Sequence, residues 1–112
     1  MSTETEIRTK LTTALRAIIT RTYSGMPDNC QNPCCNVSVD AQHENNFDAD
    51  VVKYAITIDV FANTLSELLA FKTSIITALS RSANYQSCII KSTKCTFDGT
   101  EHRLIMILSV ID

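Results

Sequence analysis

The stretch "IDVFANTLSELLAF", residues 58–71, joins an alternating β-type run to the start of a helix, and it decides the fold. In the residues before it, apolar and polar side chains alternate with period two, as in a strand that has one buried face. Within it, Thr64 and Glu67 form a T-x-x-E capping box, which marks a helix start. The stretch therefore predicts a strand over 51–61 that leads directly into a capped helix, which is expected to end near Arg81 or Ser82.

The same two signals occur earlier in the chain. Thr3 and Glu6 form another capping box, and the apolar residues that follow recur at helical spacing, so we predict a helix from about Thr3 to Thr20. The next segment, 22–34, is rich in Gly, Pro, Asn and Asp, which predicts a loop.

Period-two alternation resumes over 35–42 and predicts a strand. The polar run "HENNFDAD", residues 43–50, is expected to turn the chain into the strand over 51–61, so that the two strands form a hairpin. The last third of the chain holds two further β-type runs on either side of Asp98-Gly99, a strong hairpin signal. A two-residue and a three-residue loop at this point would turn opposite faces of the preceding strand toward the core, so its register stays open.

The predicted order of elements is α-β-β-α-β-β. Its simplest packing is an α+β domain over residues 1–112, with a four-stranded, mostly antiparallel sheet and both helices on one face. At 112 residues and 45% hydrophobic composition the chain suits a single globular domain. A domain of this size leaves much of its surface unburied, so it gains stability from any partner that covers more of it.

Charge and hydropathy argue against two classes of partner. The formal net charge of −2 does not favour a protein that grips a phosphate backbone. The chain has no run of roughly 18 apolar residues and no leader-like start, so we expect no membrane partner and a soluble cytoplasmic product.

The sequence contains no pattern that indicates catalysis or cofactor binding. Asp59 sits on the polar side of its strand, where alternation places a solvated residue in any case, and a catalytic carboxylate would need a partner group in reach. Gly25 and Gly99 are the two glycines, so there is no phosphate-binding glycine loop. We therefore expect no enzymatic activity, no catalytic residue and no cofactor.

The five cysteines could form a zinc site, supply a reactive thiol or be small apolar residues. Cys30, Cys34 and Cys35 lack a clear second pair, because Cys88 and Cys95 are seven residues apart on a strand and would face opposite ways unless a bulge intervenes. His43 and His102 are the further ligands available. The favoured interpretation is that the cysteines are reduced, small apolar residues and that no metal is bound.

Basic residues mark the polar side of the first helix and its end. A run of this kind is more often a solvated surface than a functional one. The residues are Arg8, Lys10, Arg16 and Arg21.

The last strand, "RLIMILSVI", is apolar on both faces. Helices on one side of a sheet can cover only one of these faces. The second face, with Ile105, Ile107 and Ile111, must then meet another subunit or be covered by the loop over 22–34. We favour a subunit interface.

Two runs of sequence carry a resemblance to a known family. The run "YAITIDVFANTLSELLAFKTSIITAL" and the later "TFDGTEHRLIMILSVI" resemble the small tail terminator and tail completion proteins of long-tailed bacteriophages. In those proteins a strand ends in a similar hydrophobic-Asp-hydrophobic-aromatic string, a helix of similar pattern follows, and a final hairpin closes with an apolar strand. The resemblance covers the order of elements over about residues 3–111. It covers the residue pattern itself over about 50–79 and 96–111. The segment 30–35 departs from the family pattern.

The resemblance implies a structural virion protein that caps the end of the tail tube as a ring, commonly a hexamer. It would stop tube polymerisation, join the tail to the head or neck, and be assembled in the host cytoplasm. Its partners would be further copies of itself, the tail tube protein and a head-tail connector or neck protein, with DNA only in transit through the lumen. Two polar segments are then the expected axial contacts; their residues are Asp28, Asn29, Gln31, Asn32, His43, Glu44, Asn45, Asn46, Phe47 and Asp48.

Three alternatives remain open from the sequence. The protein could be a head-tail connector or another neck component. It could be a small cytoplasmic α+β module that binds a ligand or partner. It could also be a thiol or zinc enzyme built on Cys30, Cys34 and Cys35.

Overall fold

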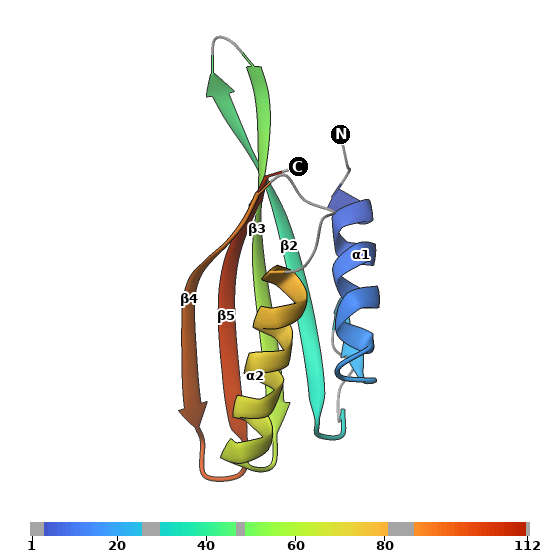
Figure 1. The fold of residues 1–112 in the computed structure, drawn as a ribbon, viewed down its shortest axis with the longest axis vertical. Coiled ribbons are helices and arrows are strands. Elements are labelled where there is room, and N and C mark those ends of the chain that lie inside the picture. Colours follow the sequence, from blue (N-terminus) through green and yellow to red (C-terminus); the bar gives the residue numbers. More distant parts are fainter. Residues whose placement is uncertain (1–3, 26–29, 47–48, 81–86, 112) are drawn as a thin grey trace.

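The computed structural model describes residues 4–25, 30–46, 49–80 and 87–111. Two helices and five strands make an α+β fold, which confirms the predicted class (Figure 1). In chain order the elements are α1 (Glu4–Arg16), β1 (Thr22–Tyr23), β2 (Cys34–Asn46), β3 (Ala49–Ala62), α2 (Leu65–Ser80), β4 (Ser87–Phe97) and β5 (His102–Ile111). Neither helix within these ranges is long and apolar enough to cross a membrane.

The strands form a single sheet in the order β1-β2-β3-β5-β4. The pairs β2–β3, β3–β5 and β5–β4 are antiparallel, as predicted, whereas β1 pairs in parallel with β2. The prediction of four strands missed β1, because a strand of two residues carries no readable alternation. The last strand of the sequence is not at an edge of the sheet: β5 lies between β3 and β4.

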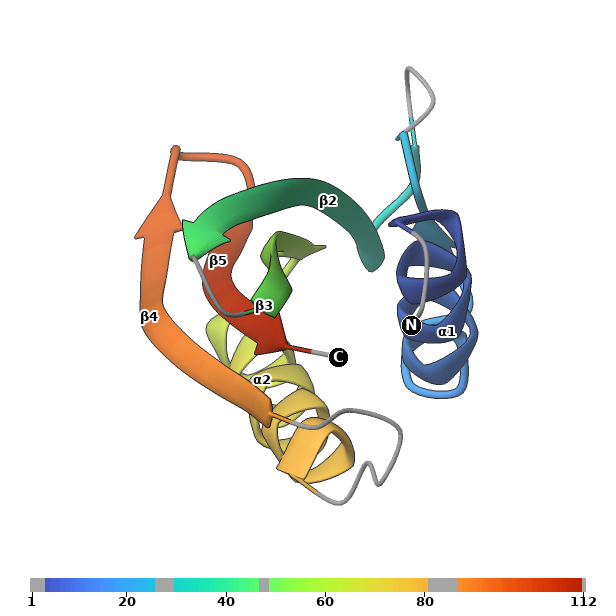
Figure 2. The same ribbon diagram turned by 90° about the horizontal axis from the view of Figure 1, so that it is seen from above.

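Both helices pack on the same face of the sheet (Figure 2). Ile7, Leu11 and Leu15 of α1 and Leu68 and Ile75 of α2 are buried in one core cluster with the sheet. The sheet's side of this core comes from alternate strand residues: Cys35, Val37, Val39, Tyr54, Ile56, Ile58, Val60, Leu104, Met106, Leu108 and Val110. The buried residues thus follow the helical and strand periods from which these elements were predicted.

The first helix is shorter than predicted. α1 ends at Arg16, not near Thr20, and the backbone amides of Ile18 and Ile19 both bond to the Leu15 carbonyl as the helix ends. Ile19 is nonetheless buried in the core, so the apolar spacing continues past the end of the helix. Thr3, half of the expected capping box, lies outside the described residues.

The second helix begins as predicted. The backbone amide of Glu67 donates to Thr64 Oγ1 at 3.2 Å, which is the forward half of a capping box and satisfies one of the helix's unpaired amides. The helix is described through Ser80, and the expected end at Arg81 or Ser82 falls outside the described residues.

The β2–β3 hairpin is longer than predicted. The backbone of His43 to Asn46 belongs to β2, and β3 resumes at Ala49, so the turn predicted over 43–50 is wrong for most of its length. β3 pairs with β5 only from Lys53 onward, so residues 43–46 and 49–52 project beyond the rest of the sheet (Figure 1). We call residues 43–46 and 49–52 the arm. Polar residues are tolerated in a strand that has left the core, which is why composition alone misplaced the turn.

The β4–β5 hairpin has neither of the loops considered from the sequence. Phe97 pairs with His102, which leaves the four residues 98–101 as the loop, and Gly99 adopts a positive φ of 101°. The Asp98 carboxylate accepts hydrogen bonds from the backbone amides of Glu101 and Thr100, each at 2.8 Å. These bonds, together with one from the Thr100 hydroxyl, lower the pKa of Asp98 to about 2.

Candidate assembly surfaces

The face of the sheet that points away from the helices, here called the open face, contains the predicted subunit-interface residues. The strand register places Ile107 beside Thr57 of β3 and Ser92 of β4. Ile107 is 42% exposed, and Ile105 is half-buried. Ile111 belongs to β5, but its side chain lies outside the described residues.

The open face also contains an apolar residue that the sequence pattern did not indicate. Ile89 is 51% exposed and pairs with Ser109, which shares the open face with Ile107. The register shifts between Ile90 and Ser92, so the alternation of β4 reverses at this bulge. The same bulge brings Cys88 and Cys95 onto one face despite their odd separation, because their β5 partners are both core residues. A break in alternation near Lys91 was the signal available in the sequence.

The loop that could have covered the open face lies elsewhere in its described part. Thr22 and Tyr23 form β1 along the edge of β2. The later part, 30–33, is held near the end of the sheet by Asn32, whose Nδ2 atom donates to Glu101 Oε2 at 2.8 Å and to Asn63 Oδ1 at 3.3 Å. Ile107 keeps its exposure, so the described part of this loop does not cover it.

The predicted axial contacts fall at the two opposite ends of the sheet. Gln31 and Asn32 lie at the end that holds the β4–β5 turn, and the Arg21 guanidinium donates to Gln31 Oε1 at 3.4 Å and to the Asn32 carbonyl at 3.5 Å. This end is therefore tied together by polar contacts. The residues His43, Glu44, Asn45 and Asn46 are in the arm at the other end, whereas Asp28, Asn29, Phe47 and Asp48 lie outside the described residues.

Asp59, the carboxylate at the strand-to-helix junction, is not an isolated solvated group. Arg103 of β5 donates to Asp59 Oδ1 through Nε at 3.1 Å and through Nη2 at 2.7 Å. The guanidinium also lies over the Phe61 ring, 5.4 Å from its centroid. The pair crosses from β3 to β5 on the open face and serves as a cross-strand link.

Two of the cysteines, Cys34 and Cys35, are buried in a way that disfavours the thiolate. Burial, followed by the neighbouring Cys30 thiol, raises the pKa of Cys34 to about 12, and burial raises the pKa of Cys35 to about 12. A reactive or metal-binding cysteine needs the opposite shift. Within the part of the chain that the structure describes, no three His, Cys, Asp or Glu side chains are placed to hold a metal ion.

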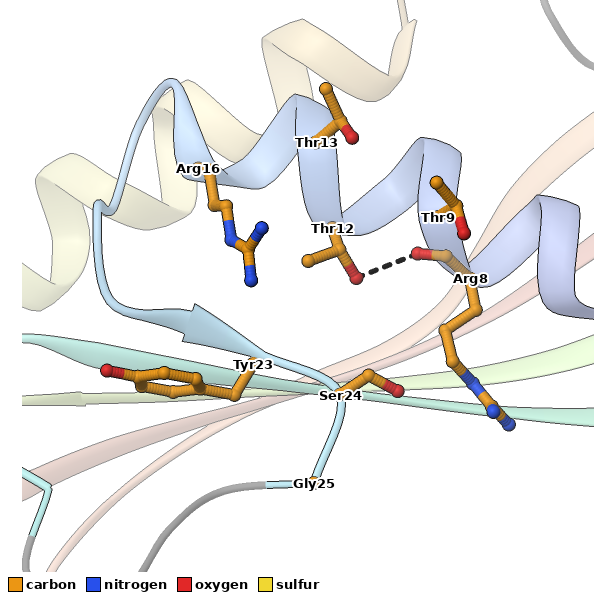
Figure 3. Close-up of a pocket in the computed structure, with 8 residues that line it drawn as sticks. All are labelled: Arg8, Thr9, Thr12, Thr13, Arg16, Tyr23, Ser24 and Gly25. Carbon is orange, nitrogen blue, oxygen red and sulfur yellow. Dashed lines mark hydrogen bonds between the residues drawn. The ribbon is translucent and has the colours of Figure 1, made fainter.

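A polar cleft of about 390 Å³ lies between α1 and the segment around β1 (Figure 3). Arg16 points into it, and its Nε donates to the Thr22 carbonyl at 3.1 Å. At the other end of the cleft, Arg8 Nη2 donates to the Val39 carbonyl at 3.4 Å. The full lining is Arg8, Thr9, Thr12, Thr13, Arg16, Tyr23, Ser24 and Gly25. Two of the helix's basic residues thus line a concave site, which the sequence had favoured as plain solvated surface.

Comparison with known proteins gives a likeness of fold. No family profile and no curated protein sequence matches the chain. A chain of the solved "Virion of native gene transfer agent (GTA) particle" superposes with a TM-score of 0.63 at 15% sequence identity. The match covers 87% of this chain and 82% of that one. The chain therefore shares its fold, over most of its length, with a component of a virion particle.

Proposed function

We propose that this protein is a structural virion protein that forms a ring on the end of a phage tail tube, stops tube polymerisation and joins the tail to the head or neck. The observation that carries the proposal is the fold shared with a chain of a gene transfer agent virion at 82% coverage of that chain. The tail-specific part rests on the resemblance of residues 50–79 and 96–111 to tail terminator proteins.

The open face supports assembly. Ile107 of β5 and Ile89 of β4 are 42% and 51% exposed on it, although both strands are paired within the chain's own sheet. Exposed apolar area on a sheet face is a cost in solution unless a partner covers it. A ring needs two different patches on each subunit, and the open face supplies one of them.

The residues weighed from the sequence for catalysis are held in other contacts or kept protonated in the described part of the chain. The raised pKa values of Cys34 and Cys35 keep both thiols protonated at neutral pH. Asp59 is engaged with Arg103. These contacts support the expectation that the protein is not an enzyme.

The test is the absolute mass of the purified protein, measured by light scattering under reducing conditions with a chelator present, over a wide concentration range. We expect a discrete ring mass, and addition of the protein to growing tail tubes should stop their extension. A ring that bound neck proteins but left tubes growing would make it a neck component. A strict monomer that also fails to join tails would overturn the proposal.

A pair of variants tests the open face within the same experiment. Ile107→Lys should lower the ring's association constant by at least roughly tenfold, because it places a charge in an apolar contact. Leu69→Lys is the matched control, since Leu69 is 44% exposed on α2, against 42% for Ile107, and lies away from the open face. Equal loss of association in both variants, or in neither, would contradict an interface at the open face.

A further inference from the structure

The two edges of the sheet differ in how their backbone hydrogen-bonding groups are used. At the β2 edge, β1 pairs with Cys35 and Asn36. Further along that edge, the Val39 carbonyl accepts a hydrogen bond from Arg8 Nη2 at 3.4 Å. At the opposite edge, β4 pairs with β5 on one side and, within the described residues, with no strand on the other (Figure 1). We propose that this free edge of β4 takes up an extended, acid-bearing segment of another protein as one more antiparallel strand.

The part of β4 that suits an added strand is Ser92–Phe97. A bulge between Ile90 and Ser92 interrupts β4, and beyond it the pairing with β5 continues without a break to Phe97. All residues of this run are exposed. In an antiparallel strand, alternate residues point both backbone groups away from the existing partner, so the run presents a regular row of donors and acceptors. Its length of about 20 Å is that of an ordinary strand.

The charge of β4 favours an acidic partner over a second copy of this chain. Residues 87–97 include Lys91 and Lys94 and no Asp or Glu. Neither lysine has an acidic partner among the described residues. Two β4 edges placed together would bring like charges side by side, and lysines on an edge strand commonly prevent such self-pairing. The β2 edge of a second copy is already engaged by β1 and by Arg8. A strand that carries acids on a different protein meets neither obstacle.

The two faces of β4 specify the side chains of the partner segment. On the open face, Lys94 pairs with Ile105 of β5. Phe97, three residues further along the strand, lies on the opposite face, where it stacks on His102 with ring centroids 4.4 Å apart and is still 60% exposed. An added strand places alternate side chains beside these two residues. We therefore expect a segment in which acids on one face alternate with apolar residues on the other.

This edge is a different surface from the open face. A strand added to β4 would lie in the plane of the sheet and would not cover the face that holds Ile107. The inference therefore goes beyond the proposed ring and does not depend on it.

The test uses a capped synthetic peptide in which Glu and Val alternate, with a second peptide that has Lys in place of Glu. The Glu–Val peptide should bind the full-length protein and slow the hydrogen exchange of alternate backbone amides within Ser92–Phe97, followed by NMR, because new strand hydrogen bonds protect them. The Lys–Val peptide should bind at least roughly threefold more weakly, because its charges repel those of β4.

A matched pair of protein variants tests the role of charge at the edge. Lys94→Glu should weaken binding of the Glu–Val peptide by at least roughly threefold and strengthen binding of the Lys–Val peptide. Lys10→Glu makes the same change in net charge at an exposed position of α1, which packs beside β2 at the other edge of the sheet, and should leave both affinities unchanged. A melting curve establishes that each variant is folded.

Several outcomes would overturn the inference. These are no binding of the Glu–Val peptide at millimolar concentration, binding without protection of Ser92–Phe97, and equal effects of the two variants. Protection of the same amides as the protein's own concentration rises, with no peptide present, would show that a second copy occupies the edge and would also overturn it. A strict monomer that binds the peptide as expected but fails to join tails would overturn the proposed function and leave this inference standing.

Discussion

The two faces of β5 are equally apolar in sequence and opposite in environment. Leu104, Met106, Leu108 and Val110 are at most 1% exposed beneath the helices, whereas Ile107, between two of them, is 42% exposed. The difference teaches that hydrophobicity of a strand says how much apolar area needs cover and not what covers it. One face is covered by the chain's own helices, and the other is available to a partner.

The largest effect expected from this comparison is on folding stability. Leu108→Ala should lower the free energy of unfolding by about 2–5 kcal/mol, because it leaves a cavity in a core that cannot fully collapse. Ile107→Ala, one residue away, should cost less than about 1 kcal/mol, since its side chain is already partly in water. Urea unfolding of the two variants at low protein concentration measures both. Equal losses would mean that the open face is covered within one chain.

The next prediction tests the buried face through pH. Burial raises the pKa of Cys35 from 9.0 to about 12. Because the folded pKa is above the unfolded one, the stabilisation is fully present below pH 9 and is lost as the pH rises from 9 towards 12. Wild type should therefore show a falling melting temperature over this range, and Cys35→Ala should show a smaller fall. Identical slopes for the two proteins would contradict this assignment.

The smallest effect is expected on the open face. Asp59→Asn removes the ion pair with Arg103. The Asp59 side chain is 13% exposed and the Arg103 side chain is 44% exposed. Exposed pairs contribute about 0.2–1 kcal/mol, and salt screens them. The loss, measured by urea unfolding at low and high salt, should shrink as salt rises. A salt-independent loss above about 2 kcal/mol would show that the pair is shielded from water, unlike the rest of the open face.

The spacing of apolar residues predicted most helices and strands, whereas residue composition was a poor guide to where the β2–β3 hairpin turns. The positions of β3 and α2 followed from alternation and from the Thr64 capping box. The stretch 43–50 was misplaced because Asn, Asp and Glu are typical of turns, whereas here most of them extend an antiparallel pair beyond the core. The early end of α1 at Arg16 was also missed, because the apolar spacing continues to Ile19.

The candidate surfaces also differ in how far a local sequence pattern indicates them. Ile105 and Ile107 could be singled out in the sequence because both parities of one strand are apolar. Ile89 was missed, because a bulge between Ile90 and Ser92 reverses the alternation of β4, and the break near Lys91 was the one local sign of it. The cleft was not predictable either, since it depends on β1 pairing with β2 and placing Tyr23 and Ser24 opposite Arg16.

By itself, the sequence determined the number of long elements, their order and the side chains that form the core, because these depend on local periodicity and on the spacing of apolar residues. Only the tertiary structure decided that β5 is an inner strand, that the arm extends beyond the other strands and that α1 and β1 enclose a basic cleft. These features depend on pairings between residues far apart in the chain, and no local pattern encodes them.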